Sequence, residues 1–193
     1  SNTGAFNLHV MPNGDTRIFC LLHPGSYANG DFTATYPDSM NYYVLKYNKD
    51  GNFQQGLHFD INKHINQSGT FWRDMVYDPV MDQYYLSGRV DYYPFTLGNT
   101  TIPISNYGIG FVAAFNNGGN SLWVQQTTNS NSYPLIYKTV VDPQGYIYVP
   151  GGTKDSSSLG GFSMSNSMGT AAYPFLIKLN PVNCNAIWGT NRS

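Results

Sequence analysis

The stretch KTVVDPQGYIYVPGG, Lys138–Gly152, decides the fold because RDMVYDPVMDQYYLSG, Arg73–Gly88, nearly repeats it. In both stretches a short apolar run reaches an Asp-Pro pair, turns, and returns as an aromatic-rich run that ends at glycine. The two Asp-Pro pairs are 64 residues apart, and so are the glycines Gly88 and Gly152. A motif repeated at a fixed period indicates a protein built from repeated supersecondary units.

A second motif occurs three times and consists of two short strands joined by a polar turn. Its copies are YVLKYNKDGNF (Tyr43–Phe53), FVAAFNNGGNSLW (Phe111–Trp123) and FLIKLNPVNCNAIW (Phe175–Trp188). Asn and Gly in these turns tolerate the left-handed backbone conformation that tight hairpins require. The stretch LHVMPNGDTRIFCLLHPG, Leu8–Gly25, is a looser copy of the first motif. Each repeat therefore contains four short strands in about 65 residues, without helical periodicity.

Four antiparallel strands repeated at this period are typical of β-propeller blades. A sandwich or jelly roll has evenly spaced strands without self-similarity, and a solenoid repeats at a shorter period. The sequence predicts an all-β fold: one domain, residues 1–193, of about three propeller blades. The repeat units cover approximately residues 1–40 (partial), 41–108, 109–172 and 173–193 (partial).

The ends of the chain bear on how such a domain closes. The chain begins with two strands of a unit and ends with two, so we expect these pairs to form one blade together. Propellers use about 4–8 blades, and three twisted sheets leave bare edges. Two interpretations follow: the domain belongs to a longer propeller protein, or two copies assemble into a six-bladed ring.

Composition excludes several classes of protein. Aromatic residues make up 16% and charged residues only 11% of the chain, which is typical of a globular β protein and unlike a disordered one. The net charge of −1 provides no basic patch for nucleic acid, and no apolar run is long enough for membrane insertion. The N-terminus is no signal peptide, which a secreted chain would have lost. Few lysines and many Asn and Tyr residues favour an extracellular or cell-surface location.

Cysteine and histidine positions carry weak signals. Cys20 and Cys184 are too few for a disulfide scaffold, and two readings stay open, a single pair or two buried thiols. In HFDINKH, His58, Asp60 and His64 are close in sequence. A metal site requires three or four convergent ligands, so we interpret this stretch as a polar loop. No metal and no cofactor are predicted.

No arrangement of residues in the sequence indicates catalysis. All 11 acidic residues are aspartates, and Asp50, Asp78 and Asp142 fall in turns where such side chains bond their own backbone. Glycoside hydrolysis requires two carboxylates across a cleft, and no pair is marked. No Gly-x-Ser-x-Gly elbow and no phosphate-binding loop occur. We predict a protein that is not an enzyme; the alternative is a polysaccharide-acting propeller enzyme with Asp residues in its central channel.

Exposed aromatic side chains are the candidates for ligand binding, because their flat faces stack on sugar rings. The predicted residues are Trp72, Tyr92, Tyr93, Tyr107 and Tyr133. The alternative for each is packing between blades. Trp123 and Trp188 recur at one repeat position, so we predict that they belong to the blade core.

The repeat also resembles a known family. The stretches GFVAAFNNGGNSLWVQQ (110–126) and KTVVDPQGYIYVPGGT (138–153) are similar to the SBBP β-propeller repeat. The stretch GRVDYYPFTLGNTTIPISNYGIGFVAAF (88–115) resembles its longer version in secreted proteins of Bacteroidota, where LGNTTL joins one blade to the next. The resemblance covers nearly the whole chain in about three copies and implies blades rather than a chemistry.

Together these observations predict a non-enzymatic extracellular β-propeller that serves as a scaffold, adhesion or binding module of a secreted or cell-surface protein. The expected partners are a protein or glycan at one rim, where inter-blade loops gather. Other blades of the parent protein, or a second copy, are expected as further partners.

Overall fold

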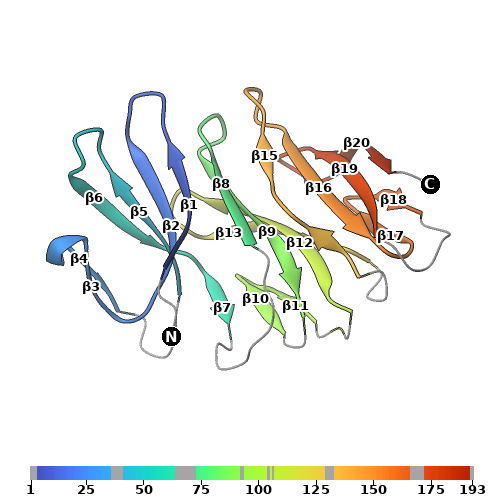
Figure 1. Cartoon of the computed structure of the whole chain (residues 1–193), viewed down its shortest axis with the longest axis horizontal. Coiled ribbons are helices and arrows are strands. Elements are labelled where there is room, and N and C mark those ends of the chain that lie inside the picture. The colour runs from blue at the N-terminus through green and yellow to red at the C-terminus, as the bar shows by residue number, and fades with distance from the viewer. Residues whose placement is uncertain are drawn as a thin grey trace.

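The computed structural model describes residues 4–35, 41–63, 73–91, 94–103, 105, 107–128, 133–165 and 172–191. In this part of the chain the protein is all-β with antiparallel sheets, as predicted, and its one helical element is the 3-10 turn Ala28–Gly30 (Figure 1). No helix in it has the length and apolar character needed to cross a bilayer.

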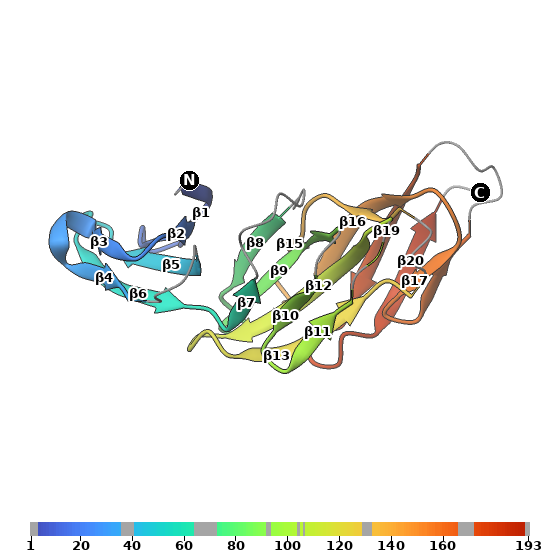
Figure 2. The ribbon, with the colours of Figure 1, turned by 90° about the horizontal axis from the view of Figure 1, so that it is seen from below.

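Three larger sheets follow one another along the molecule (Figures 1 and 2). Sheet 1 has the order β1 (Gly4–Val10), β2 (Thr16–Leu22), β5 (Asn41–Tyr47), β6 (Phe53–His58). Sheet 2 has the order β8 (Arg73–Asp78), β9 (Gln83–Val90), β12 (Ile109–Asn116), β13 (Ser121–Gln126). In sheet 3, β14 (Leu135–Ile136) and β15 (Val140–Val141) both pair with β16 (Ile147–Thr153), followed by β19 (Tyr173–Leu179) and β20 (Ala186–Asn191).

A small hairpin separates the second and third long strands of every sheet along the chain. The hairpins are β3–β4 (Gly25–Tyr27, Phe32–Ala34), β10–β11 (Phe95–Leu97, Thr100–Ile102) and β17–β18 (Ser157–Leu159, Phe162–Met164). Strand β7 (Ile61–Lys63), which follows sheet 1 along the chain, pairs with β10 and extends the second hairpin to a three-stranded sheet of order β11-β10-β7. The same arrangement of strands therefore occurs three times.

Side-chain oxygens at the start of the turns determine where the strands end. Three turns begin with an asparagine that accepts a hydrogen bond from the backbone N–H two residues later: Asn48, Asn116 and Asn180. Asp78 and Asp142 do the same, which confirms their predicted turn role. Asp50 does not fit its prediction, because the acceptor in its turn is the preceding asparagine.

The strand register refines the sequence repeat by one residue. Gly88 lies opposite Phe111, and Gly151 lies opposite Phe175. The structural counterpart of Gly88 is thus Gly151 rather than Gly152. The reason is that the turn after the second Asp-Pro pair is one residue shorter than the turn after the first.

The expectation that the first and last strand pairs share one sheet is wrong. Strands β1 and β2 share sheet 1 with β5 and β6, because β2 pairs with β5, whereas β20 pairs with β19 alone. Strands that are near in sequence pair most readily because their connection is short. The boundaries between sheets consequently differ from those of the sequence units at 41–108 and 109–172. Sheet 1 takes its strands from residues 4–58 and sheet 2 from residues 73–126.

The core consists of two layers between the three sheets and a smaller cluster on the face of sheet 1 turned away from sheet 2, where Tyr43 and Leu45 pack with Phe32 of the β3–β4 hairpin. Between sheets 1 and 2, the ring of Phe59 meets Tyr84 and Phe115 edge-on, with centroids 5.2 and 5.3 Å apart. Between sheets 2 and 3, Val112 of β12 packs with Ile177 of β19. Each fully buried side chain of this size contributes about 1.5–3 kcal/mol. Sheet 2 is buried on both faces, which explains the nearly unbroken apolar run of β12.

The two repeated tryptophans have different surroundings. Trp123 is half-buried, its ring centroid lies 6.0 Å from that of Tyr85, and its Nε1 donates to the Pro181 carbonyl of sheet 3 at 2.9 Å. Trp188 is 42% exposed. The predicted core role is therefore wrong for Trp188, because no described sheet covers its face of sheet 3.

Both cysteines are free. Cys20 is buried, and burial raises the pKa of its thiol to about 12, whereas Cys184 is half-buried. A pair between them is excluded, and the reading as a buried thiol applies to Cys20 alone.

Candidate functional site

The predicted aromatic site is only partly described by the structure. Trp72, Tyr92 and Tyr93 lie outside the described residues. Tyr107 is 49% exposed and Tyr133 is half-buried. Tyr107 alone of these two thus offers a largely open ring.

A buried ion pair connects the segments of Tyr107 and Tyr133. Arg89 Nε lies 2.6 Å from Asp91 Oδ1, and both side chains are buried. The Arg89 guanidinium carbon lies 3.7 Å from the ring centroid of Tyr133, a cation–π contact. On the other segment, Gly108 packs so tightly against this pair that a Cβ would come 2.1 Å from Arg89 Nε. Arg89 therefore contacts both segments: its guanidinium packs on the ring of Tyr133, and its side chain packs against Gly108 next to Tyr107.

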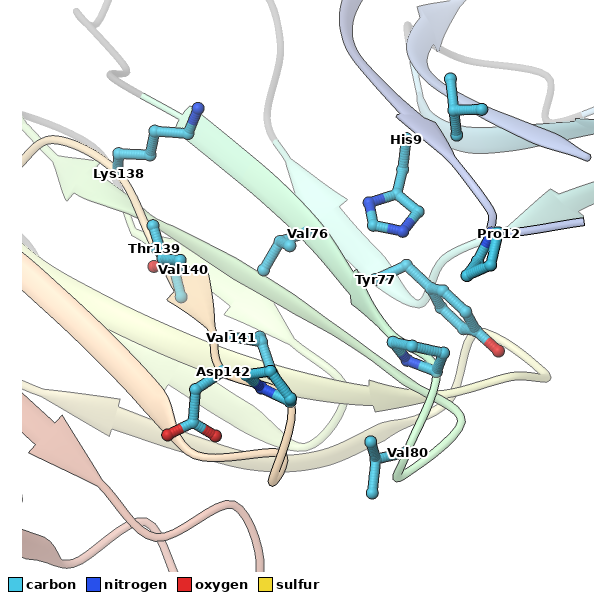
Figure 3. A pocket seen from close by; sticks show the side chains of 13 residues that line it. His9, Pro12, Val76, Tyr77, Val80, Lys138, Thr139, Val140, Val141 and Asp142 are labelled. Atoms are coloured by element: carbon cyan, nitrogen blue, oxygen red, sulfur yellow. The ribbon is translucent and has the colours of Figure 1, made fainter. Parts of the chain in front are cut away.

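A hollow of about 490 Å³ lies between β1 of sheet 1, β8 of sheet 2 and β15 of sheet 3 (Figure 3). Strands β1 and β8 are the first strands of their sheets along the chain, and β15 is the second short strand of sheet 3. Its walls are mainly apolar and include Val10, Val76, Tyr77, Val80, Val140 and Val141. Sequence reasoning did not select these residues, because a valine in a strand gives no signal of a site. The repeated Asp-Pro turns, whose prolines Pro79 and Pro143 also line the hollow, were the available signal.

Asp74 of β8 connects β1 to the residue that precedes β15, beside this hollow. Its carboxylate accepts a hydrogen bond from Asn7 Nδ2 of β1 at 2.7 Å and another from the backbone N–H of Thr139 at 3.0 Å. The three residues are separated by about one repeat along the chain. The Oγ atoms of Thr139 and Ser87 are buried without a hydrogen-bond partner among the described residues.

Three titratable groups that line the hollow have shifted pKa values: His9, Asp142 and Tyr77. Burial, with the positive charge of Arg17, lowers the pKa of His9, so this imidazole is neutral at pH 7. Partial desolvation alone would raise the pKa of Asp142. The backbone N–H groups of Tyr146 and Gln144 outweigh it, and the pKa of Asp142 is lowered. Asp142 also forms an ion pair of 3.3 Å with Lys178, so its carboxylate is occupied by internal contacts.

A polar cluster next to the hollow joins sheets 1 and 2. Arg17 Nη1 donates to the Tyr84 hydroxyl at 2.8 Å, and the Arg17 guanidinium carbon lies 3.8 Å from the ring centroid of Tyr77. Tyr77 in turn donates to Asp82 at 2.5 Å. Burial and this carboxylate raise the pKa of Tyr77 from 10.0 to about 12, and burial also raises the pKa of Tyr84.

The raised pKa of Tyr77 predicts sensitivity to alkali. Between pH 10 and pH 12 the unfolded chain releases this proton while the folded chain keeps it, so the free energy of unfolding falls as pH rises. For Tyr77→Phe we expect a loss of about 1 kcal/mol at pH 8 from the missing hydrogen bond. Because phenylalanine cannot ionise, its difference from the wild type should shrink between pH 10 and pH 12. Urea unfolding of wild type and variant across this pH range measures the difference in the free energy of unfolding. A difference that stays constant with pH would contradict the raised pKa of Tyr77.

Metal ligands do not gather in the described part of the chain. No group of three His, Cys, Asp or Glu side chains there is arranged to hold an ion. His58 packs on Tyr43 with ring centroids 5.2 Å apart, and burial lowers its pKa. His64, the other histidine of the HFDINKH stretch, lies outside the described residues.

A scan against protein-family models and a search of curated protein sequences found no match to this chain. The resemblance to the SBBP repeat accordingly stays a prediction from its sequence motifs.

Proposed function

We propose that the chain is a non-enzymatic β-propeller module of the SBBP type, serving as a scaffold or adhesion unit of a secreted or cell-surface protein. The observation that carries the proposal is the threefold recurrence of one sheet order, with the sheets packed face to face. Four-stranded antiparallel sheets stacked radially are the blades of propellers. Rigid scaffolds of this kind usually bind their ligands through the loops that they hold in place.

The state of the carboxylates favours binding over catalysis. Asp74 uses both oxygens for hydrogen bonds to neighbouring sheets, and Asp142 is bonded to its own turn and to Lys178. A glycosidase needs one carboxyl group free to transfer a proton and another facing the substrate. Polysaccharide hydrolysis through channel aspartates is therefore the less supported alternative.

The proposed binding surface is the exposed ring of Tyr107, which adjoins Gly108, the residue packed against Arg89. An exposed tyrosine ring has few rotatable bonds, so it loses little conformational freedom on binding a sugar or an apolar side chain. Protein and glycan are the two classes of ligand proposed.

The test combines a glycan array, a pull-down from extracellular protein fractions, and an assay for sugar release from a polysaccharide panel. We expect a bound glycan or protein and no sugar release. Tyr107→Ala should weaken binding about tenfold, while Tyr137→Ala, which alters another exposed tyrosine, should leave it unchanged. Sugar release that is abolished by Asp142→Asn would overturn the proposal in favour of the enzyme.

A further inference from the structure

The strand register identifies which positions of sheet 2 its neighbours cover. One row across sheet 2 consists of Val76, Tyr85, Ala114 and Trp123. This row packs toward sheet 3, and we call its side the front face of a sheet. On the opposite side, the rear face, Met75 and Tyr77 pack toward sheet 1. The chain thus contains two contacts of one kind, each between the front face of a sheet and the rear face of the next.

No described sheet packs on the rear face of sheet 1, and the β3–β4 hairpin covers only part of it, burying Tyr43 and Leu45. The register places Leu8 where sheet 2 has Met75, and Val10 where sheet 2 has Tyr77. Met75 and Tyr77 are 1% and 5% exposed, whereas Leu8 and Val10 are 57% and 59% exposed. Two positions that are core in the middle sheet are therefore apolar surface in the first sheet.

The front face of sheet 3 shows the complementary situation. Its equivalent row consists of Val140, Tyr148, Lys178 and Trp188. Val140 and Trp188 are 49% and 42% exposed, although their counterparts in sheet 2 pack against the second core layer. Large apolar side chains at both ends of the stack are thus exposed at positions that neighbouring sheets cover elsewhere.

The lysine in this row is compatible with a covering sheet. Lys178 occupies the position that Lys46 has in sheet 1. Lys46 lies in the contact between sheets 1 and 2, and its Nζ donates to Asn117 Oδ1 in the β12–β13 turn of sheet 2 at 2.8 Å. A lysine at this position therefore does not prevent the contact between two sheets, although Lys178 itself pairs with Asp142 of its own sheet at 3.3 Å in this structure.

We propose that the front face of sheet 3 docks on the rear face of sheet 1 of a second copy of this chain. The contact continues the two that the chain already makes internally, and one chain carries both of its halves. This inference rests on the proposed propeller module, whose blades pack in the same way. Two such contacts close a two-chain ring with twofold symmetry. Trp188 then meets the β5–β6 turn of the second copy, as Trp123 meets the β19–β20 turn.

Light scattering coupled to size-exclusion chromatography measures the native mass of the unmodified chain and so tests the proposal. We expect a native mass of about 43 kDa, twice the 21.5 kDa of one chain. A mass of one chain at every concentration would overturn it.

Two variants test the two halves of the contact separately. Trp188→Asp changes the front face of sheet 3, and Leu8→Asp changes the rear face of sheet 1. Each should raise the dissociation constant of the dimer roughly 30-fold or more, as expected for a buried hot-spot side chain. Leu122→Asp is the matched control, because Leu122 is 47% exposed on β13 of the middle sheet. Circular dichroism and thermal melting establish that each variant is folded.

Mixing the two variants tests the head-to-tail geometry. A Trp188→Asp chain keeps an intact rear face and a Leu8→Asp chain keeps an intact front face, so the mixture should form one-to-one pairs. Pairs in which identical faces meet would not be restored by mixing, and that result would overturn the proposal. Failure of association leaves the ligand-binding test unaffected, because that test reads glycan or protein capture by the single chain.

Discussion

Gly119→Ala is expected to lower the free energy of unfolding by roughly 2–5 kcal/mol. Gly119 lies in the β12–β13 turn with φ of +82°, and a Cβ there would come 2.1 Å from the backbone carbonyl oxygen of His58 in sheet 1. Two effects add: the left-handed conformation disfavours alanine, and the overlap forces two sheets apart. Backbone atoms cannot move aside as a flexible side chain can. Chemical denaturation of wild type and variant measures the difference.

Gly51 provides a matched control for this change. It occupies the corresponding turn of sheet 1 with φ of +80°, and no atom lies within 4 Å of the position of its Cβ. Gly51→Ala retains the backbone strain but lacks the overlap, so we expect a loss of only about 1–2 kcal/mol. Equal losses for the two variants would mean that sheet 2 does not approach sheet 1 at His58.

Asp74→Ala is expected to lower the free energy of unfolding by roughly 2–4 kcal/mol. The change deprives the backbone N–H of Thr139 of its acceptor and removes one of the two acceptors of the Asn7 amide. One group lies on β1 and the other precedes β15, so the loss affects the packing of both strands beside β8. Urea unfolding monitored by circular dichroism measures the effect.

Asp74→Asn separates hydrogen bonding from side-chain size. Its amide keeps one acceptor oxygen, so we expect about half the loss seen with alanine. Asp50→Ala, at an exposed turn position, should change stability by less than about 0.5 kcal/mol. A loss of that small size for Asp74→Ala would show that the carboxylate does not hold the sheets together.

The hairpins were predictable from the sequence because their signals are local. The turns at Asn116 and Asp142 combine residues that favour tight turns with apolar runs on either side, and the structure has strands there. The pairing of β2 with β5 was not predicted, since the small hairpin between them interrupts the sequence pattern. Aromatic packing on glycine was equally hidden: a Cβ at Gly189 would lie 2.7 Å from the Phe162 ring.

The candidate site was predictable only in part. Tyr107 was selected as an exposed aromatic and is exposed, while Tyr133 was selected for the same reason and has Arg89 against its ring. Composition marks an aromatic residue as a candidate but does not reveal which cation lies beside it. The hollow across β1, β8 and β15 depends on three strands that are about one repeat apart in sequence.

The sequence by itself determined the all-β class, the threefold recurrence of strand pairs, and the turn residues that end them. Those features depend on the alternation of apolar and polar residues and on the turn-forming residues, which both act among a few neighbouring positions. Only the tertiary structure decided which pairs share a sheet, which faces are covered, and where the hollow lies. Trp123 and Trp188 illustrate the difference: they occupy one position of the repeat, yet a neighbouring sheet covers only Trp123. Burial depends on what packs against a residue from a distant part of the chain, which a local pattern does not encode.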